Sequence, residues 1–443
     1  MKIAIIGSGI SGLTCAWLLR NKHDVTVFEA GSYIGGHTHT VDFDLEGRNY
    51  SIDTGFIVCN DRTYPNFLRL IDHLKVDRKP SEMSFSLRCD ASGVEYCGSG
   101  LNGLFSQRRN LLKPSFLRMV RDILRFNKQG SLDADTVADD MTVGQYLDQN
   151  NYGEKFAQYY LLPMGAAIWS CPTGTFREFP IHFILEFYRH HGLLSLTNRP
   201  QWYVINGGSK QYVRSLTSGM ENRINLNTPV CSVVREHDRV LILTNSGTEA
   251  FDEVIFACHS DQALSLLESP TQQETEVLSA FPYSANHAVL HTDTSVLPKH
   301  RRAWSSWNYR IRPDISDRPT VTYNMNILQG IESPHTFCVS LNDVDQIAND
   351  NVIGQYNYSH PVFSLQRKQM QLRHSELIRN NRSSFCGAYW GNGFHEDGVV
   401  SALAVCKRFG AKDILDTALS NGDVSDTRQA QSTTNSSSWL AGT

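Results

Sequence analysis

The start of the chain alternates short apolar runs with a segment of helical periodicity. Lys2–Ile6 is a β-branched run of the kind that is buried in a parallel sheet. From Ile10 to Asn21 apolar residues recur with helical spacing, and a second apolar run, Val25–Phe28, ends at Glu29. Strand, helix and strand in this order predict a βαβ unit.

The turn before the helix carries three glycines in the spacing G-x-G-x-x-G. Gly7 permits a tight turn, Gly9 lets the backbone approach a pyrophosphate, and Gly12 lets the helix pack closely on the strand. Free N–H groups at the helix start bind anionic phosphates. Glu29 follows by about 20 residues, where a carboxylate accepts hydrogen bonds from ribose hydroxyls. The pattern predicts a dinucleotide site, and the alternative is a glycine-rich turn without a ligand.

A second match to the same spacing occurs at Gly98, Gly100 and Gly103. The preceding residues, Val94–Cys97, read VEYC, which is too polar and too short for a buried strand. No second βαβ pattern follows. We therefore predict no separate NAD domain.

Two motifs shortly after the first unit indicate which dinucleotide is bound. Gly35–Thr38 reads GGHT and resembles the G-G-(Arg/His) segment of the flavin amine oxidase superfamily, which includes protoporphyrinogen oxidases and phytoene desaturases. Asp53–Gly55 resembles the next conserved turn of that superfamily, which approaches the flavin. The resemblance implies FAD as the cofactor.

The middle of the chain continues the resemblance. Asn227–Glu236 resembles a strand that lays the backbone of the residue matching Val230 against the adenine. Asp252–His259 resembles the strand and turn that return to the dinucleotide.

The end of the chain completes the resemblance. Gly387–Gly391 and Phe394–Gly398 precede a predicted helix, Val400–Phe409, whose start would point at the flavin and favour negative charge there. These last motifs carry Tyr-Trp and His-Glu-Asp where typical amine oxidases have another aromatic pattern, which argues against an amine substrate.

The fold class follows from this order of motifs. We predict an α/β protein with a discontinuous Rossmann-type FAD-binding domain and an inserted α+β substrate domain. The FAD-binding domain comprises 1–80, 205–280 and 381–421, the substrate domain 81–204 and 281–380, and a disordered tail rich in Ser, Thr, Asn and Gln comprises 422–443. The implied cofactor-binding residues are Gly7, Gly9, Ile10, Ser11, Gly12, Glu29, Ala30, Gly35, Gly36, His37, Thr38, Asp53, Thr54, Gly55, Val230, Ala257, Gly391, Glu396, Asp397, Gly398 and Val399.

A narrower resemblance concerns the substrate. Leu162–Pro172, Trp202–Gly208 and Tyr389–Gly398 look like a bacterial group of predicted FAD-binding proteins that are often encoded beside cyclopropane fatty-acid synthases. A related flavoprotein of furan fatty-acid synthesis desaturates methylated acyl chains. The resemblance implies a lipid substrate.

The predicted substrate domain is rich in aromatic residues, which suit an apolar pocket over a flavin. The alternative is that these residues form ordinary core. They are Trp169, Phe183, Phe187, Tyr188, Trp202, Tyr203, Trp304, Trp307, Tyr309 and Tyr323.

Arg108–Lys128 has the pattern of a basic amphipathic helix. One helical face carries Arg118, Arg121, Arg125 and Lys128, and another largely carries Phe116, Leu117, Val120, Ile123 and Leu124. Such a helix is typical of attachment to an anionic membrane surface. The alternative is a domain-surface helix with a solvated basic face.

The candidates for catalysis are His182, His395 and Tyr389, because each lies beside aromatic or flavin-facing sequence. A structural role is the alternative for each histidine. The pairs His190–His191 and His37/His39 match no metal-ligand spacing, so we predict no metal site.

Charge, cysteines and hydropathy narrow the environment. A formal net charge of -4 gives no reason to expect nucleic-acid binding. The ten cysteines contain no C-x-x-C pair and suit reduced thiols in a cytosolic protein. The sequence shows no signal peptide, and no apolar run approaches the roughly 20 residues that span a bilayer. We expect a cytoplasmic protein that is soluble or attached peripherally to the inner face of the membrane.

These features predict an FAD-dependent oxidoreductase that takes a hydride from a hydrophobic substrate onto flavin N5. The favoured substrate is an unsaturated or methyl-branched fatty acyl chain in phospholipid. One alternative is an amine or porphyrinogen oxidase. Another is a non-catalytic FAD-containing partner of a lipid methyltransferase.

Overall fold

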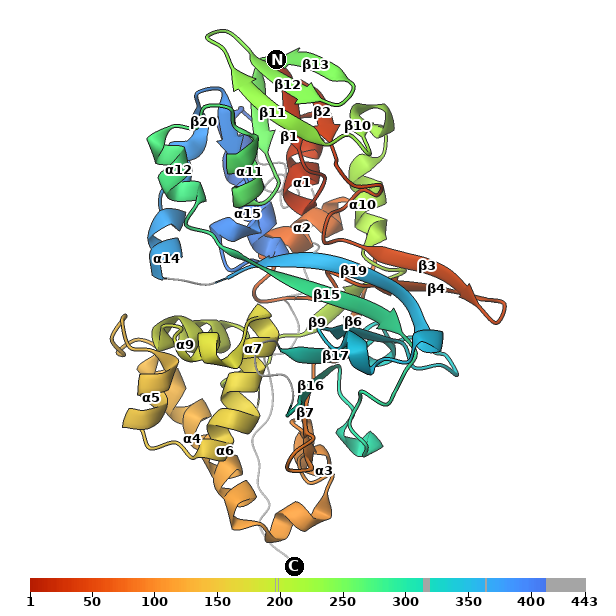
Figure 1. The fold of residues 1–443 in the computed structure, drawn as a ribbon, viewed down its shortest axis with the longest axis vertical. Helices are drawn as coiled ribbons and strands as arrows, with labels where there is room; N and C mark the ends of the chain where they lie inside the picture. The colour runs from red at the N-terminus through yellow and green to blue at the C-terminus, as the bar shows by residue number, and fades with distance from the viewer. Residues whose placement is uncertain (196, 198, 314–318, 363–364, 412–443) are drawn as a thin grey trace, which may run out of the picture.

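The computed structural model describes residues 1–195, 197, 199–313, 319–362 and 365–411. Figure 1 shows a mixed α/β fold, with one sheet and its helices at the top and a second sheet beside a group of helices at the bottom. The predicted disordered tail, 422–443, lies outside the described residues, as does the part of the predicted FAD-binding segment after residue 411. The predicted α/β class is confirmed.

A six-stranded sheet forms the centre of the upper half. Its strands, in spatial order, are β10 (Ile224–Asn225), β2 (Asp24–Phe28), β1 (Lys2–Ile6), β14 (Glu253–Phe256), β21 (Ser383–Phe385) and β20 (Ile378–Asn380). All neighbours are parallel except β20 and β21. Ile3 and Ile5 pack into one core cluster and Ala4 and Ile6 into another, which explains the unbroken apolar run of β1. Strands from three separate parts of the chain thus lie side by side.

Helices pack around this sheet. They are α1 (Ile10–Leu19), α2 (Pro65–His73), α10 (Lys210–Thr217), α11 (Ser260–Leu266), α12 (Gln272–Leu278) and α15 (His395–Arg408). Every residue of α1 is buried. The start of α15 rests on the start of α1, since the Ser11 hydroxyl donates to the Gly398 carbonyl at 3.0 Å. α15 begins at His395 rather than at the predicted Val400.

An antiparallel sheet lies beside the parallel one at the top of Figure 1. It consists of β11 (Val230–Arg235), β12 (Val240–Thr244) and β13 (Gly247–Phe251). β11 confirms the strand predicted within Asn227–Glu236, and β14 confirms the one predicted within Asp252–His259.

A seven-stranded sheet dominates the other half. Its spatial order is β19 (Val352–Pro361), β15 (Tyr283–His291), β18 (Cys338–Leu341), β17 (Thr320–Asn324), β16 (Trp307–Ile311), β7 (Phe85–Cys89) and β8 (Val94–Cys97). The prediction that VEYC is too polar and short for a buried strand was wrong, because it forms β8 and all four residues are buried. Its polar group is satisfied, since Glu95 accepts bonds from the Lys299 and His300 amides. β8 runs antiparallel to β7, so it starts no second βαβ unit.

Short sheets and turns connect the two halves. The small sheets are β3 (Thr40–Leu45) with β4 (Arg48–Asp53), and β5 (Cys59–Asn60) with β9 (Trp202–Ile205) and β6 (Arg78–Ser81). The remaining short helices are η3 (Glu221–Arg223), η4 (Arg301–Ala303), α13 (Met325–Leu328), η5 (Val344–Gln346), η6 (Asn349–Asn351), α14 (Leu365–Gln371), η7 (His374–Leu377) and η8 (Ala388–Trp390).

Helices make up the lower left of Figure 1 and the bottom below β7, where α3 is labelled. The elements are α3 (Gly100–Leu104), η1 (Arg108–Leu112), α4 (Pro114–Asp133), α5 (Val143–Gln149), α6 (Glu154–Phe156), η2 (Ala157–Leu161), α7 (Leu162–Trp169), α8 (Thr173–Arg177) and α9 (Ile181–His190). η2 is one turn of π-helix, a feature that often marks a functional site.

The predicted basic helix is present as η1 and α4, but its apolar residues divide into two groups. Phe116 is buried in the core, whereas Leu117 and Leu124 are 43% and 50% exposed. On the basic face, Arg118 and Arg125 flank the buried Asp122 at 3.9 and 3.5 Å. Part of the predicted basic charge is therefore balanced within the helix.

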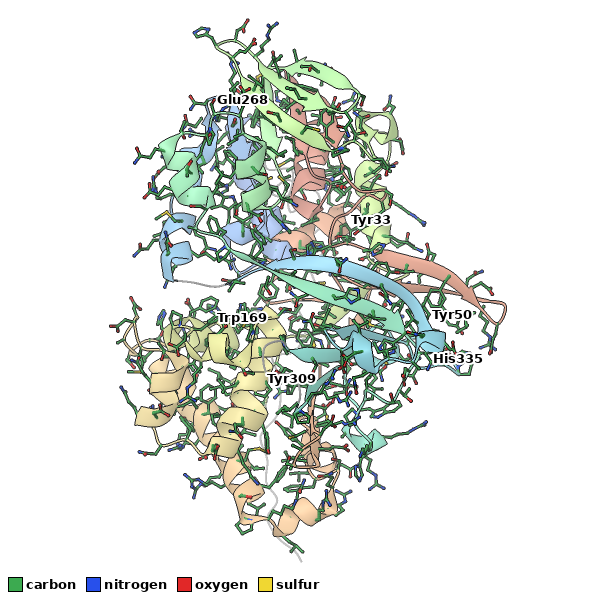
Figure 2. All side chains as sticks on the ribbon, viewed as in Figure 1. Tyr33, Tyr50, Trp169, Glu268, Tyr309 and His335 are labelled. Carbon is green, nitrogen blue, oxygen red and sulfur yellow. The ribbon has the colours of Figure 1, made fainter. Side chains whose placement is uncertain are left out.

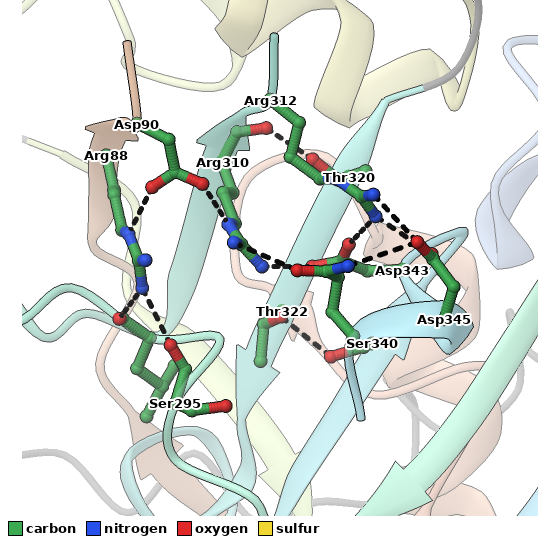
Figure 3. Close-up of polar contacts among 12 residues, drawn as sticks. Arg88, Asp90, Ser295, Arg310, Arg312, Thr320, Thr322, Ser340, Asp343 and Asp345 are labelled. Carbon is green, nitrogen blue, oxygen red and sulfur yellow. Dashed lines mark hydrogen bonds and ion pairs between the residues drawn. The ribbon is translucent and has the colours of Figure 1, made fainter. Parts of the chain in front are cut away.

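Six charged residues form an ion-pair ladder at the ends of β7, β16 and β18 (Figure 3). Asp90 bridges Arg88 and Arg310 at 2.7 and 2.8 Å. Asp343 bridges Arg310 and Arg312 at 3.3 and 2.7 Å, and Asp345 closes the series on Arg312 at 2.7 Å. Each charge has an opposite neighbour, which is the condition for burying charges without a large loss of free energy.

No helix in the described part of the chain has the length and apolar character that crossing a bilayer requires.

Candidate cofactor and substrate site

One cavity of about 870 Å³ extends from the glycine loop after β1 to α4 in the helical half. Its walls come from both halves of the molecule, and Trp169 at the end of α7 is among its lining residues (Figure 2). The volume lies in the range of cofactor and ligand sites.

The glycine loop has the geometry that its predicted role requires. Gly7 has a φ of +105°, a conformation that favours glycine. A side chain at Gly12 would overlap the Gly7 carbonyl oxygen, so glycine is needed for the close packing of α1 on β1. A Cβ at Gly9 would meet no atom within 4 Å and would project into open space at the cavity wall. α1 begins directly after Gly9 without a side-chain cap, which leaves its first N–H groups for a ligand.

Glu29 lies at the end of β2 and lines the cavity. Its carboxylate accepts hydrogen bonds from the Ser8 amide at 2.9 Å, the Ser8 hydroxyl at 2.6 Å and the Gly31 amide at 2.7 Å. These bonds hold the acid in place beside the glycine loop. Binding of a ribose by Glu29 stays a prediction.

The structure brings most of the predicted cofactor-binding residues to the cavity. Those that line it are Gly7, Gly9, Ile10, Ser11, Glu29, Ala30, Gly35, Gly36, His37, Thr54, Gly55, Val230 and Ala257. Those that are not among its lining residues are Gly12, Thr38, Asp53, Gly391, Glu396, Asp397, Gly398 and Val399.

Asp53 has a role in the protein itself. Its buried carboxylate accepts bonds from the Ser209 amide at 2.9 Å and the Gln329 amide nitrogen at 3.2 Å. Burial raises the pKa of Asp53 to about 6, although bonds from Thr40 and Ser209 oppose the increase. The acid therefore fixes the turn at Gly207–Ser209 rather than facing the cavity.

The acids at the start of α15 also bind protein groups. Glu396 accepts bonds from the Asn66 and Phe67 amides at 3.1 and 2.9 Å and so joins α15 to α2. Asp397 accepts from the Phe394 amide at 2.8 Å, and burial raises its pKa to about 7. Sequence motifs located these residues near the site but could not distinguish a supporting role from ligand contact.

Three histidines, His37, His259 and His360, line the cavity and form what we call the histidine cluster. The His37 ring centroid lies 5.9 Å from that of His259 and 5.4 Å from that of His360. Of these three histidines, only His37 was expected at the site from the sequence motifs. His360 was missed because it comes from β19, which no motif connects with the glycine loop.

Two of the three candidate catalytic residues line the cavity. His395 does so, but its Nε2 is 2.9 Å from the Tyr212 hydroxyl and 3.1 Å from the Thr38 hydroxyl, and burial lowers its pKa to about 3. This favours the structural alternative. Tyr389 lines the cavity with a buried hydroxyl that has no partner among the described residues. His182 lines a different pocket, where it lies 3.8 Å from Asp139.

The predicted aromatic residues divide evenly. Trp169, Phe187, Trp202, Trp307 and Tyr323 line the cavity, whereas Phe183, Tyr188, Tyr203, Trp304 and Tyr309 do not. Figure 2 shows Tyr309 on the strands next to the helices that carry Trp169. Both the pocket and the core interpretations thus hold for part of the set.

Beyond the glycine loop the cavity continues as an apolar branch toward α4. It is lined there by Val120, Ile123, Leu124, Tyr160, Met164, Ile168 and Leu193. Tyr160 belongs to the π-helical turn η2, and burial raises the pKa of its hydroxyl to about 12. The branch therefore offers a mainly hydrocarbon surface, with the charge of the lining residue Arg199 acting on Tyr160.

Within the described residues, no group of three or more His, Cys, Asp or Glu side chains is arranged to hold a metal ion. The absence of a metal site stays a prediction.

The site fits a flavin dinucleotide. It combines an uncapped helix start, a glycine that faces open space, and two buried polar atoms without partners among the described residues, His37 Nε2 and the Tyr389 hydroxyl. Fold and site together define a dinucleotide-binding α/β oxidoreductase. A family model described as flavin containing amine oxidoreductase matches residues 10–319. The chain belongs to this family and is an FAD-dependent oxidoreductase.

Solved structures share the fold at low sequence identity. Putrescine oxidase bound to putrescine has a TM-score of 0.65 and 14% identity, covering 93% of this chain and 100% of that one. A CLA-producing fatty acid isomerase from P. acnes has a TM-score of 0.63 and 16% identity, covering 92% and 98%. Cyclohexylamine oxidase from Brevibacterium oxydans IH-35A has a TM-score of 0.63 and 15% identity, covering 92% and 99%. No curated protein matches the sequence.

Proposed function

We propose that the protein is a dehydrogenase or desaturase of unsaturated or methyl-branched fatty acyl chains. Its discontinuous FAD-binding domain would hold the cofactor at the glycine loop, and the inserted domain would hold the acyl chain. When bound, FAD accepts a hydride equivalent from a substrate carbon, and the second hydrogen leaves as a proton, so the product gains a double bond.

The observation that carries this proposal is the chemistry of the apolar branch. Glu29 is the one Asp or Glu among the described lining residues, and it lies beside the glycine loop. An alkylammonium group in the branch would meet no carboxylate, and burying an unpaired charge is costly. A hydrocarbon chain needs no polar partner and gains about 0.8 kcal/mol for each buried CH₂.

The positively charged residue that lines the cavity, Arg199, supports a substrate whose acyl chain carries an anionic head group. Arg199 is the one Lys or Arg among the described lining residues, and its charge acts on the buried Tyr160 hydroxyl. A fatty-acid carboxylate and a phospholipid phosphate share the chemistry that an arginine binds.

The residues around the cavity exclude water and fix the orientation of a chain rather than supply a strong acid. Burial lowers the pKa of His395 and so keeps it neutral, and its Nε2 lies within hydrogen-bond distance of two hydroxyl groups. Tyr389 keeps a hydroxyl without a protein partner among the described residues, and burial raises its pKa well above the usual range, so it can donate a hydrogen bond but does not lose its proton near neutral pH. Tyr389 is therefore the better candidate for contact with cofactor or substrate.

Exposed apolar and basic residues of α3, η1 and α4 support peripheral attachment of the protein to an anionic membrane at its inner surface. Leu101, Leu112 and Leu117 are 75%, 87% and 43% exposed on α3, η1 and α4. Leu124 is 50% exposed and also lines the cavity, so one exposed apolar residue of α4 borders the apolar branch. Exposed basic residues on the same segment, including Arg121 and Lys128, suit anionic lipid.

The test is anaerobic reduction of the bound flavin, followed by absorbance, with four additions: free oleate, vesicles of dioleoyl phosphatidylglycerol, putrescine, and a porphyrinogen. Reduction by either lipid, with a product two mass units lighter, supports the proposal and identifies the head group. Reduction by putrescine or the porphyrinogen alone would replace it with the corresponding oxidase. No reduction by any lipid, together with stimulation of a lipid methyltransferase, would favour a non-catalytic partner.

A further inference from the structure

The histidine cluster lies against the glycine loop, on the side from which α1 starts. A Cβ at Gly36 would approach the Gly9 Cα to 3.2 Å, so the segment that leads into His37 touches the residue before the helix. The first N–H groups of α1 and the three imidazoles therefore border the same part of the cavity. This is where the negative charge of a dinucleotide is expected.

The hydrogen bonds of the cluster show which ring nitrogens remain for a ligand. His360 Nδ1 lies 3.1 Å from the Asn286 amide nitrogen, which donates, so the proton of the neutral ring is on Nε2. His37 has a hydrogen bond to the backbone of Ser359, while its buried Nε2 has no partner among the described residues. If the single N–H of the neutral His37 ring donates to that backbone, Nε2 carries no proton and can only accept a hydrogen bond.

Electrostatics keep the cluster uncharged when no anion is present. Burial lowers the pKa of His37 well below its usual value, and His360, His259 and His395 lower it further. Burial likewise lowers the pKa of His360 to about 4. Three other ionisable groups face the cluster: Tyr358 from β19, Tyr283 from β15 and Asp261 from α11. Of these, only Asp261 favours a charged imidazole, because it raises the pKa of His259.

We infer that the histidine cluster binds the pyrophosphate of FAD, and that His37 takes up a proton when FAD binds. Phosphate oxygens only accept hydrogen bonds, so His37 Nε2 can face one only after it gains a proton. His360 can donate from Nε2 while neutral. The superfamily segment that Gly35–Thr38 resembles has either arginine or histidine at the position of His37. An arginine there would carry its charge permanently.

The sign of the resulting pH dependence follows from linkage. The phosphate charge raises the pKa of His37 in the complex, whereas burial keeps it low in the FAD-free protein. Between these two values each bound FAD brings about one proton with it. The dissociation constant for FAD therefore rises about 10-fold per pH unit across that window, so binding weakens as pH increases.

The experiment measures FAD binding to the full-length apoprotein by calorimetry in buffers of different ionisation enthalpy, and by flavin fluorescence from about pH 6 to pH 8. We expect proton uptake that approaches one per FAD, and a rise in the dissociation constant of up to about 100-fold over those two units. An unchanged dissociation constant without proton uptake would overturn the inference, and this readout needs no variant.

Variants assign the proton to His37. In His37→Asn, proton uptake and pH dependence should disappear. In His37→Arg, binding at high pH should be restored without proton uptake. The matched control is His191→Asn, since His191 also lines the cavity but has both ring nitrogens bonded, to the Phe187 carbonyl at 2.9 Å and the Thr63 hydroxyl at 3.2 Å. Uptake that persists in His37→Asn, or is lost in His191→Asn, contradicts the assignment.

Discussion

The ion-pair ladder and the histidine cluster are both groups of buried ionisable residues, but they satisfy their polar atoms differently. In the ladder, Asp343 is 1% exposed and meets two guanidinium groups within 3.3 Å. In the cluster, His37 has a buried nitrogen without a partner among the described residues. The ladder joins strand ends of the seven-stranded sheet (Figure 3), and none of its six residues is among those that line the cavity, whereas the cluster lines it.

The difference separates groups that serve the fold from groups that serve a ligand. Charges that are buried with opposite partners have their polar atoms satisfied within the protein, which offsets the free energy that their desolvation costs. A buried polar atom without a partner lowers stability by about 1–3 kcal/mol unless a ligand supplies the missing bond. The cluster therefore has a buried nitrogen that a ligand could satisfy, whereas in the ladder the desolvation that raises the pKa of Asp343 is opposed by Arg312 and Arg310 within the protein.

The largest effect is expected in the ladder. Asp343→Ala removes the buried carboxylate that Arg310 and Arg312 share and leaves each with one carboxylate partner among the described residues, Asp90 and Asp345 respectively. The free energy of unfolding should fall by about 3 kcal/mol, the lower end expected for breaking a buried ion pair. Asp345→Ala is the matched control, because Asp345 is 58% exposed and should change stability by about 1 kcal/mol or less. Thermal and urea unfolding would measure both. Equal losses in the two variants would show that burial does not determine the role of the ladder.

In the cavity, Gly9→Val should remove FAD and leave the fold intact. The new side chain would meet no protein atom within 4 Å of its Cβ and would occupy the space of the pyrophosphate. We expect a loss of at least about 100-fold in affinity, or about 2.7 kcal/mol. Flavin absorbance and circular dichroism measure the two properties, and Gly174→Ala, at another open position, is the control. A yellow Gly9→Val protein would place the phosphates elsewhere.

Glu29→Ala should reduce FAD affinity by a similar or smaller amount. Loss of a charged acceptor for ribose hydroxyls corresponds to about 1.5–3 kcal/mol, or roughly 10- to 150-fold. Because the carboxylate also holds Ser8 and Gly31, Glu29→Gln separates the effects by retaining one acceptor oxygen. Fluorescence titration measures the affinity. If Glu29→Ala binds FAD as tightly as the wild type, the ribose acceptor is another residue.

The smallest effect concerns the membrane. Arg121→Gln together with Lys128→Gln should reduce partitioning onto anionic vesicles by about 1 kcal/mol per residue, or about 30-fold in total, and high salt should weaken wild-type binding. Arg118→Gln is the control, since this charge already lies 3.9 Å from Asp122 and should matter less. Co-sedimentation with phosphatidylglycerol vesicles measures partitioning. Wild-type protein that stays in the supernatant at low salt would rule out this attachment.

The sequence predicted the glycine loop and its strands well because their roles are local. Lys2–Ile6 was expected as a strand and forms β1 with the same bounds. The periodicity of α4 indicated an amphipathic helix, but only the tertiary contacts show that Phe116 is buried while Leu124 stays half exposed. Cluster partners such as His360 could not be predicted, because a contact between β19 and the glycine loop leaves no periodic signal in either segment.

The order in which the chain is made sets the moment at which the cofactor can be captured. Ser11 at the start of α1 rests on Gly398 of α15, 387 residues further along the chain. At about 5–20 residues per second, a ribosome needs roughly 20 to 80 s to bridge that distance. During the first part of this interval the βαβ unit lacks its neighbour β14, and until near its end it lacks β21 and α15, so apolar surfaces stay uncovered. We therefore expect FAD to be captured only after α15 has been made, and chains truncated before α15 should not bind it.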